Sequence, residues 1–359
     1  MHFPDWREGN FYQGRLAEAQ RRQGFDVSFS DRTGGLFPFL RSVRKSRPDI
    51  LHFHWIDDIA GQNDLGAVRS LARQFLFRLD LLLTLRLLQG RLVWTVHNLR
   101  SHDCRHPRAD RAAHLFLARA ANRLFAHSPL ARDQVVQTFG IPAERVVVTP
   151  HGNLIGCYAD TTTRIESRER LAIDEDRFTF LYFGHVRPYK GLEALLSSFA
   201  ELSDPRKLLI VAGRAPDRGY AASIRQMVSS SAVVFLDEFI PDEELQFLFH
   251  ACDVVVLPFR DVLTSGSLLL AMSFGRMVIA PKLGSVPDYA PASENVLYDP
   301  AISGSLSGAL RSAAGRDVEG SGRRNLEAVR RFTWEDAASR TTAVYRELMA
   351  ATGDREVGG

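Results

Sequence analysis

The sequence contains few cysteines and no long apolar run. Three cysteines occur among 359 residues, and Cys104, Cys157 and Cys252 share no close spacing. This spacing argues against a disulfide framework and a zinc site, and it suits the reducing cytosol. No window reaches eighteen uninterrupted apolar residues, which argues against a helix that spans a membrane. The chain also opens without the charged flank and apolar stretch of an export signal, so we expect a cytoplasmic protein.

The excess of charge is small as well. The chain has 45 Lys and Arg and 42 Asp and Glu, a formal charge of +3. This is too mild to predict a nucleic acid partner, but it suits an anionic ligand or membrane surface. The most apolar stretch, residues 71–88, is interrupted by three arginines and Asp80. We favour a helix buried against a sheet. The alternative is a helix lying on the inner face of the cell membrane, with its arginines at lipid head groups.

Apolar runs alternate with helical stretches along the chain. This pattern predicts an α/β fold with two Rossmann-like, doubly wound parallel sheets, and 45% hydrophobic residues suffice for two cores. We place a first domain at 1–152, a linker at 153–176 and a second domain at 177–335. A C-terminal helix and tail, 336–359, should pack back toward the first domain. The predicted strands are 26–30, 50–55, 91–97, 123–126, 145–149, 178–183, 207–212, 233–236, 253–257 and 277–280.

The most informative segment is 178–191, where an apolar strand ends at Gly184 and a helix begins after Arg187 and Lys190. Backbone N–H groups and the helix dipole favour an anion at a helix start, and two cations are unfavourable there without one. Arg offers a planar fork of donors and Lys a mobile point charge, so the pair suits a diphosphate. The alternative is a solvated pair of cations.

A second candidate phosphate site lies at residues 264–275. Gly266 allows close approach of the backbone, and Ser265 and Ser267 supply donors at the start of an apolar helix. A plain N-capped core helix would explain the same serines. Gly213 follows the predicted strand 207–212. It either allows a tight turn at the end of that strand or forms part of a nucleotide site.

Several fragments resemble glycosyltransferases of the GT-B fold, particularly the bacterial relatives of phosphatidylinositol mannosyltransferase and glycogen synthase. The matching pieces are VTPHGN at 148–153, FGHVRPYKG at 183–191, LIVAGR at 209–214, ACDVVVLP at 251–258, SGSLLLAMSFG at 265–275 and FTWE at 332–335. In the first half, PDW at 4–6, NFYQ at 10–13, LHFHW at 51–55 and VWTVHN at 93–98 resemble a bacterial exopolysaccharide branch.

The resemblance implies two domains that face each other across a cleft, the first binding the acceptor and the second the sugar nucleotide. The family carries its diphosphate clamp at the positions of Arg187 and Lys190. Asn10 begins a segment that relatives place near the donor. His151 lies where relatives carry Pro-Asn-Gly, and it either contacts the donor sugar or braces the turn between the domains. Retaining relatives carry glutamates where this chain has Val262 and Leu270, so ribose binding and stereochemistry are not carried over.

His97 is the candidate catalytic residue of the first domain. It ends a predicted strand at the carboxyl edge, where relatives place a histidine near the sugar, and a base is needed if configuration inverts. A purely structural role for His97 is an equally good interpretation of the sequence. Asp57, His102 and Asp103 are further candidates on the acceptor side. His52 and His54 share one strand face, where structural hydrogen bonds are favoured over metal binding.

We therefore predict a glycosyltransferase that moves a hexose from a GDP- or UDP-sugar to a glycan, lipid-linked or polysaccharide-precursor acceptor. We expect no metal ion and no cofactor beyond the nucleotide sugar. The alternatives are a sugar-nucleotide epimerase on the same fold and a non-catalytic subunit that binds a sugar nucleotide. A dehydrogenase is disfavoured because no Gly-x-Gly-x-x-Gly follows a strand and opens a helix.

Overall fold

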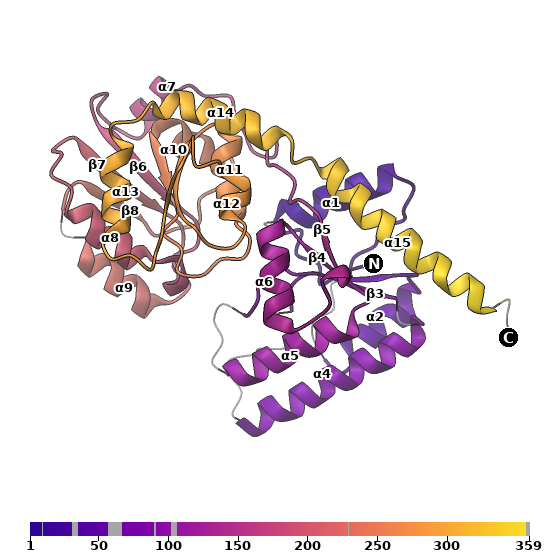
Figure 1. The fold of residues 1–359 in the computed structure, drawn as a ribbon. Helices are drawn as coiled ribbons and strands as arrows, with labels where there is room; N and C mark the ends of the chain where they lie inside the picture. The colour runs from indigo at the N-terminus through magenta and orange to yellow at the C-terminus, as the bar shows by residue number, and fades with distance from the viewer. Residues whose placement is uncertain are drawn as a thin grey trace. The chain divides into compact units, whose positions relative to one another are not determined.

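The computed structural model describes residues 1–8, 10–30, 35–56, 67–89, 91–101, 106–228 and 230–356. They form two compact units, which Figure 1 colours along the chain. Unit 1 comprises Met1–Gly152 and Phe332–Gly359, and unit 2 comprises Asn153–Arg331. Each unit is built on one parallel sheet, so the predicted α/β class is confirmed.

The sheet of unit 1 has five parallel strands in chain order. They are β1 (His2–Phe3), β2 (Leu51–Phe53), β3 (Leu92–Thr95), β4 (Arg123–Ala126) and β5 (Val146–Val148). The predicted strand 26–30 is wrong, since Phe29 forms only an isolated bridge with His2. Strand β1 offers just two residues for pairing. The bridge takes the edge of β1 that β2 leaves open, so the order of the chain across the sheet reverses between β1 and β2.

Helices complete unit 1. Helix α1 (Phe11–Arg22) and the C-terminal α15 (Trp334–Glu356) run side by side (Figure 1), and Gln20 donates to Thr341 and Tyr345 across their contact. The remaining helices are α2 (Pro38–Ser46), α4 (Ala67–Leu87), α5 (Pro107–Ala120) and α6 (Pro129–Phe139), with a 3₁₀ turn at Ala143–Arg145. The last segment of the chain therefore belongs to unit 1.

Unit 2 has a six-stranded parallel sheet in the order β11-β10-β9-β6-β7-β8. The strands are β6 (Phe178–Phe183), β7 (Lys207–Ala212), β8 (Val233–Leu236), β9 (Val254–Val256), β10 (Met277–Pro281) and β11 (Val296–Tyr298). Strands β7 and β8 add to one side of β6, and β9 returns to its other side. The chain order thus reverses between β6 and β9, the place where doubly wound sheets bind ligands.

The helices of unit 2 are α7 (Arg164–Arg170), α8 (Leu192–Ala200), α9 (Arg218–Met227), α10 (Leu245–Ala251), α11 (Gly266–Ser273), α12 (Val286–Tyr289), α13 (Ser305–Ala313) and α14 (Val318–Arg330), with a 3₁₀ turn at Pro188–Lys190. Most of them connect successive strands, while α7 precedes the first strand and α13 and α14 follow the last.

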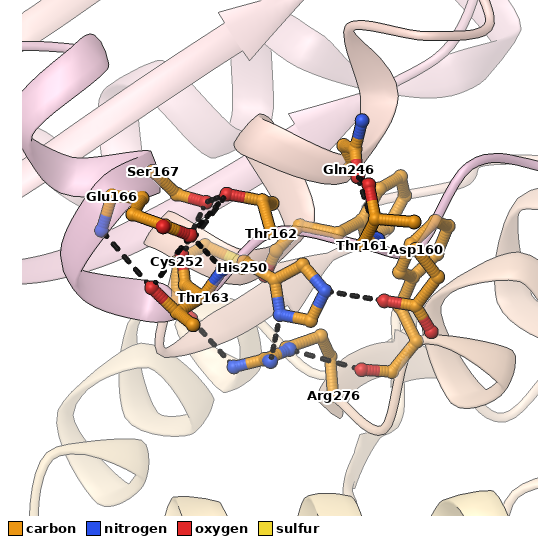
Figure 2. Close-up of polar contacts among 12 residues, drawn as sticks. Asp160, Thr161, Thr162, Thr163, Glu166, Ser167, Gln246, His250, Cys252 and Arg276 are labelled. Atoms are coloured by element: carbon orange, nitrogen blue, oxygen red, sulfur yellow. Dashed lines mark hydrogen bonds and ion pairs between the residues drawn. The ribbon is translucent and has the colours of Figure 1, made fainter.

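Residues 153–176 differ from the predicted linker, because they belong to unit 2 and carry α7. Figure 2 shows how this segment joins α10: His250 Nε2 lies 2.5 Å from Asp160 Oδ1, and the Thr161 N–H donates to Gln246 Oε1 at 2.9 Å. Thr163 in this segment caps α7 by forming a capping box with Glu166.

A buried arginine anchors the same helix. Arg168 is 4% exposed, and its guanidinium donates to the carbonyl oxygens of Ala251, Glu175 and Arg177. It also lies 3.4 Å from the Asp253 carboxylate. A buried charge with this many partners fixes α7 to the sheet, so the charged composition of the segment is misleading as a sign of solvent exposure.

Helix α4 is buried on one side only. Its Asp80 carboxylate turns inward and accepts the N–H groups of Phe39 and Leu40 at 2.9 Å. Outward-facing Phe75 and Leu82 are 66% and 50% exposed. The expected burial therefore holds for one face of α4. None of the helices in the described ranges combines the length and hydropathy needed to cross a bilayer.

Candidate functional site

In unit 2, the carboxyl ends of β6 and β7 meet at two glycines. Gly184 and Gly213 have φ values of 135° and 145°, which disfavour any other residue. A Cβ on Gly213 would lie 2.1 Å from the Gly184 carbonyl oxygen, and a Cβ on Gly184 would lie 3.5 Å from Ser267 Oγ. The strand exits and the start of α11 therefore converge, and three of the residues predicted from sequence lie together.

Four basic side chains gather after these strands: His185, Arg187, Lys190 and Arg214. Burial, and then the Arg187 guanidinium, lower the pKa of Lys190 to about 8. Burial, followed by Lys190, lowers the pKa of His185, and Arg214 adds to this effect. Cations that depress one another's pKa create a positive potential, which a bound anion would relieve.

Lys190 is held by aromatic rings across the reversal of the sheet. Its Nζ lies 4.4 Å from the ring centroid of Phe259, which follows β9, and 5.2 Å from that of Tyr189. The Arg260 N–H donates to the Tyr189 carbonyl at 2.9 Å, and a Cβ on Gly191 would lie 2.0 Å from a carbonyl oxygen in the β9 loop. Cation–π contacts position an ammonium without neutralising its charge, so Lys190 is fixed and remains available to an anion.

The serines at the start of α11 divide between two roles. The Ser265 hydroxyl accepts the Leu268 N–H at 3.1 Å, which is an ordinary N-cap. Open space surrounds the position of a Cβ on Gly266, so unit 2 itself does not demand a glycine there. Ser267 is the one whose hydroxyl faces Gly184.

In unit 1, the carboxyl ends of four neighbouring strands each carry a histidine: His54 after β2, His97 after β3, His127 after β4 and His151 after β5. Because side chains alternate along a strand, these four share a sheet face with His2 and His52. Helices α1 and α15 contact this face through Gln20 and Tyr345, and all six imidazoles are buried.

Hydrogen bonds connect four of these imidazoles in a row. The chain runs Gln20, His2, His54, His97, His127 and Thr149, with successive heavy-atom distances of 2.9, 3.0, 3.3, 3.4 and 3.1 Å. It uses both ring nitrogens of every histidine in it, and we call it the imidazole chain.

The two ends of the imidazole chain fix its proton count. Thr341 donates its hydroxyl within its own helix, so the Gln20 amide nitrogen faces Thr341 and the amide oxygen faces His2. The other end is the Thr149 carbonyl oxygen. Both ends accept, so five links need five protons, whereas four neutral imidazoles bring four. One link between imidazoles lacks a proton, and the two longest links both belong to His97.

His97 is therefore the position where an added proton would complete the missing hydrogen bond. Burial, and then the neighbouring imidazoles of His127 and His54, lower its pKa well below 6.5. The Trp55 ring stacks on it with centroids 4.0 Å apart. His97 is thus a neutral base at neutral pH, with both ring nitrogens directed at other histidines.

His2, His52 and His54 have ring nitrogens within 4.8 Å of one another. The His52 nitrogens, however, already lie 2.5 Å from Tyr345 Oη and 2.7 Å from Thr95 Oγ1. Structural hydrogen bonding, the favoured interpretation of His52 and His54, accounts for these contacts.

The other predicted residues of the first domain have mixed positions. Asn10 caps α1 by accepting the Tyr12 N–H at 2.9 Å, so residues 11–13 begin a helix. His151 Nδ1 lies 2.7 Å from the Gly152 carbonyl oxygen, and burial lowers its pKa to about 4. Asp57, His102 and Asp103 lie outside the described residues.

Comparison with known proteins connects this geometry to a family. The sequence model of "Glycosyl transferases group 1" matches residues 163–314, which span β6 to β11. A GDP-mannose:glycolipid 4-beta-D-mannosyltransferase of Xanthomonas campestris is 30% identical over 247 residues, covering 67% of this chain and 64% of that protein. Residues 163–314 of the chain thus match the group 1 glycosyl transferases. It spans about two thirds of the length of the Xanthomonas relative.

Other known proteins are also similar to the chain. An O-antigen chain mannosyltransferase B of Escherichia coli is 24% identical over 281 residues, covering 72% of this chain and 71% of that protein. Sucrose-phosphate synthase of Thermosynechococcus elongatus aligns with a TM-score of 0.74 at 19% identity, over 96% of this chain and 94% of that one. HepE of Anabaena, solved in complex with UDP-glucose, aligns with a TM-score of 0.69 at 18% identity, over 86% of this chain and 82% of that one. These structural likenesses show the GT-B fold that the sequence predicted.

Sequence reasoning missed part of both clusters. His2 and His127 complete the imidazole chain, and His185 lies among the cations of unit 2. A signal was present, because a histidine recurs at the carboxyl end of successive apolar strands. That repetition indicates a shared sheet face, whereas each histidine taken alone indicates little.

Proposed function

We propose that the protein transfers a hexose from a nucleoside diphosphate sugar to a glycolipid or another glycan acceptor, in exopolysaccharide biosynthesis. Unit 2 binds the donor and unit 1 the acceptor in this proposal. The observation that carries it is the group of cations at the reversal of the unit 2 sheet, beside glycines that leave the backbone open. The names of the Xanthomonas and Escherichia relatives make GDP-mannose the first donor to test.

The chemistry that such a site can perform is stabilisation of a leaving group. When the bond between the anomeric carbon and the diphosphate breaks, its electron pair and negative charge pass to the diphosphate. The Arg187 guanidinium and the Lys190 ammonium would bind that charge in a partly dehydrated site. Stabilisation of a leaving group by such a site is worth several kcal/mol. Gly184, Gly213 and Ser267 would place backbone and hydroxyl groups against the phosphates. We propose that no metal ion takes part, which activity in the presence of EDTA would test.

The acceptor hydroxyl must lose a proton in the same reaction. We propose that His97 takes part in this step, because its protonation would supply the one hydrogen bond that the imidazole chain lacks. His97 would act as a general base if one of its nitrogens leaves its neighbour for the substrate. Its role would appear as a loss of kcat in His97→Gln, with donor affinity unchanged.

Thermal shift with nucleotides tests the donor site directly. A ligand that binds only the folded protein raises its melting temperature, so GDP or UDP should stabilise the wild type. Arg187→Ala and Lys190→Ala should abolish that shift while leaving the melting temperature without nucleotide nearly unchanged. Arg206→Ala is the matched control, an exposed cation of unit 2 beside Asp204. Equal nucleotide shifts in all four proteins would contradict the assignment.

Turnover separates the proposed activity from its rivals. Sugar transfer from GDP-mannose or UDP-glucose to a lipid or glycan fraction, lost in both clamp variants, supports it. Conversion of the donor without an acceptor would identify an epimerase. Nucleotide binding without turnover would identify a binding subunit.

A lipid-linked acceptor would require contact with a membrane surface, and we propose α4 for it. Its exposed Phe75 and Leu82 share the helix with Arg78 and Arg86, whereas its Asp80 turns inward. Apolar side chains with flanking arginines suit an anionic bilayer surface. The wild type should sediment with vesicles that contain phosphatidylglycerol, whereas the Phe75→Asp variant should stay in the supernatant. Equal sedimentation of both proteins would refute this contact.

A further inference from the structure

Each of the two strands at the reversal of the unit 1 sheet is followed by a tryptophan. Trp6 follows β1 and Trp55 follows β2, and their rings meet edge to face with centroids 6.3 Å apart. Trp6 is 39% exposed. Ligands of doubly wound sheets bind at the carboxyl edge beside such a reversal, so the exposed indole stands where a ligand is expected. The proposed transfer mechanism above uses neither tryptophan.

The backbone that carries Trp6 is fixed by a buried side chain. Gln13 on α1 is fully buried, and its amide donates to the Pro4 carbonyl and accepts the Trp6 N–H, both at 2.7 Å. The Asp5 N–H donates to the Ser30 carbonyl at 2.9 Å. A buried amide that uses both polar groups on one short loop holds the indole in place before any ligand arrives. Such preorganisation lowers the entropic cost of binding.

Charged residues flank Trp6 in the chain. Arg7 donates to both oxygens of the Asp5 carboxylate, at 2.9 and 2.7 Å, and its guanidinium lies 3.9 Å from the Phe29 ring centroid. Hydrogen bonds from Arg7 hold the pKa of Asp5 below its usual value, so the carboxylate is ionised at neutral pH. An aromatic face with an adjacent carboxylate and guanidinium matches a pyranose, which presents an apolar C–H face and a rim of hydroxyls.

We infer that Trp6, supported by Trp55, is the stacking platform for a pyranose ring of the acceptor. This inference rests on the proposed function and adds to it the position of the acceptor sugar. The Trp55 ring continues from Trp6 to His97, on which it stacks at 4.0 Å. A sugar on Trp6 would thus lie beside the same edge of the sheet as the candidate base.

Fluorine NMR on the full chain labelled with 5-fluorotryptophan tests binding without any need for turnover. The chain has four tryptophans, so four resonances can be assigned with single variants. Titration with methyl β-D-glucopyranoside and methyl α-D-mannopyranoside should shift the Trp6 resonance with at least one of them. The buried Trp94 is the internal control, and acyclic sorbitol controls for general solvent effects. No selective shift of Trp6 with either pyranoside would overturn the inference.

Steady-state kinetics gives an independent readout. Trp6→Ala should raise the acceptor KM at least about tenfold, the equivalent of about 1.4 kcal/mol, with donor KM unchanged. Trp6→Phe should restore most of the loss, and Ile165→Ala, an exposed side chain of unit 2, should change neither constant. An unchanged acceptor KM in Trp6→Ala would overturn the inference. If pyranosides shift Trp6 but GDP and UDP fail to bind, the proposed function fails and the sugar platform stands.

Discussion

Acid should unfold unit 1 before unit 2, because its histidines are buried in the neutral form. Burial lowers the pKa of His2 and His127 to about 3 and that of His151 to about 4, against 6.5 in an unfolded chain. As the pH falls below 6.5, the unfolded chain takes up protons that the folded unit refuses. The stability is therefore present above pH 6.5 and is lost as the pH falls toward the folded pKa values.

The size of the effect follows from the same three residues. Protonating a group of pKa 6.5 in the unfolded chain alone lowers the free energy of unfolding by about 1.9 kcal/mol between pH 7 and pH 5. Three such groups lower it by about 6 kcal/mol, comparable with the whole stability of many domains. The slope near pH 5.5 should be about 3.7 kcal/mol per pH unit. His52, His54 and His97 have pKa values lowered in the same direction and would steepen it.

The distribution of tryptophan provides the assay. All four tryptophans lie in unit 1, at Trp6, Trp55, Trp94 and Trp334, so their fluorescence reports the unfolding of that unit alone. Urea titrations from pH 7 to pH 5 should show a steep fall in the fluorescence midpoint, while circular dichroism follows both units. His127→Gln should remove about one proton from the slope. A fluorescence midpoint that is the same at pH 7 and pH 5.5 would refute the buried neutral state of these histidines.

Three further substitutions test other contacts. Gly213→Ala would bring a Cβ within 2.1 Å of a carbonyl oxygen at a φ of 145°, so the thermal shift with nucleotide should disappear. Arg168→Met leaves the carbonyl oxygens of Ala251, Glu175 and Arg177 without this donor and removes one of two arginines beside Asp253, so it should destabilise unit 2 by about 3–5 kcal/mol in calorimetry. Tyr345→Phe removes the partner of His52 and should lower the fluorescence-detected stability of unit 1 by about 1–3 kcal/mol, and no loss would contradict the contact.

Local patterns were sufficient for the strands near the proposed donor site. The segments 178–183, 207–212 and 233–236 were predicted with the bounds that the structure has, because uninterrupted apolar runs followed by glycine or acidic residues leave little ambiguity. The grouping of Gly184 with Gly213 also follows from parallel strands that end at one edge. The family resemblance supplied the expected function, since position at a strand end does not identify a ligand.

Other features depend on contacts between distant parts of the chain, and local patterns misjudge them. Residues 153–176 look solvated because they are polar, yet Arg168 is buried and donates to Ala251, far along the chain, as well as to Glu175 and Arg177. The strand expected at 26–30 has enough apolar residues, but its partner β1 is too short to extend the ladder. A segment forms a strand only when a neighbouring strand can pair with it, and the sequence of the segment alone does not show that neighbour.

Two kinds of contact on the unit 1 sheet face explain how a C-terminal helix completes this domain. The helix begins at Trp334, whereas the last strand of the unit ends at Val148. Val93 and Phe125 share an apolar cluster with Val344 and Leu348 of α15. Apolar contact of this kind stabilises the helix but tolerates sliding along its axis. On the same face Tyr345 must also meet the ring of His52, which pairs with Val93 in the sheet. If α15 shifted along its axis, buried polar groups would lose their partners. The buried histidines therefore favour one position of α15 over the neighbouring ones. The same buried histidines make that position sensitive to acid, because each one resists protonation in the folded unit.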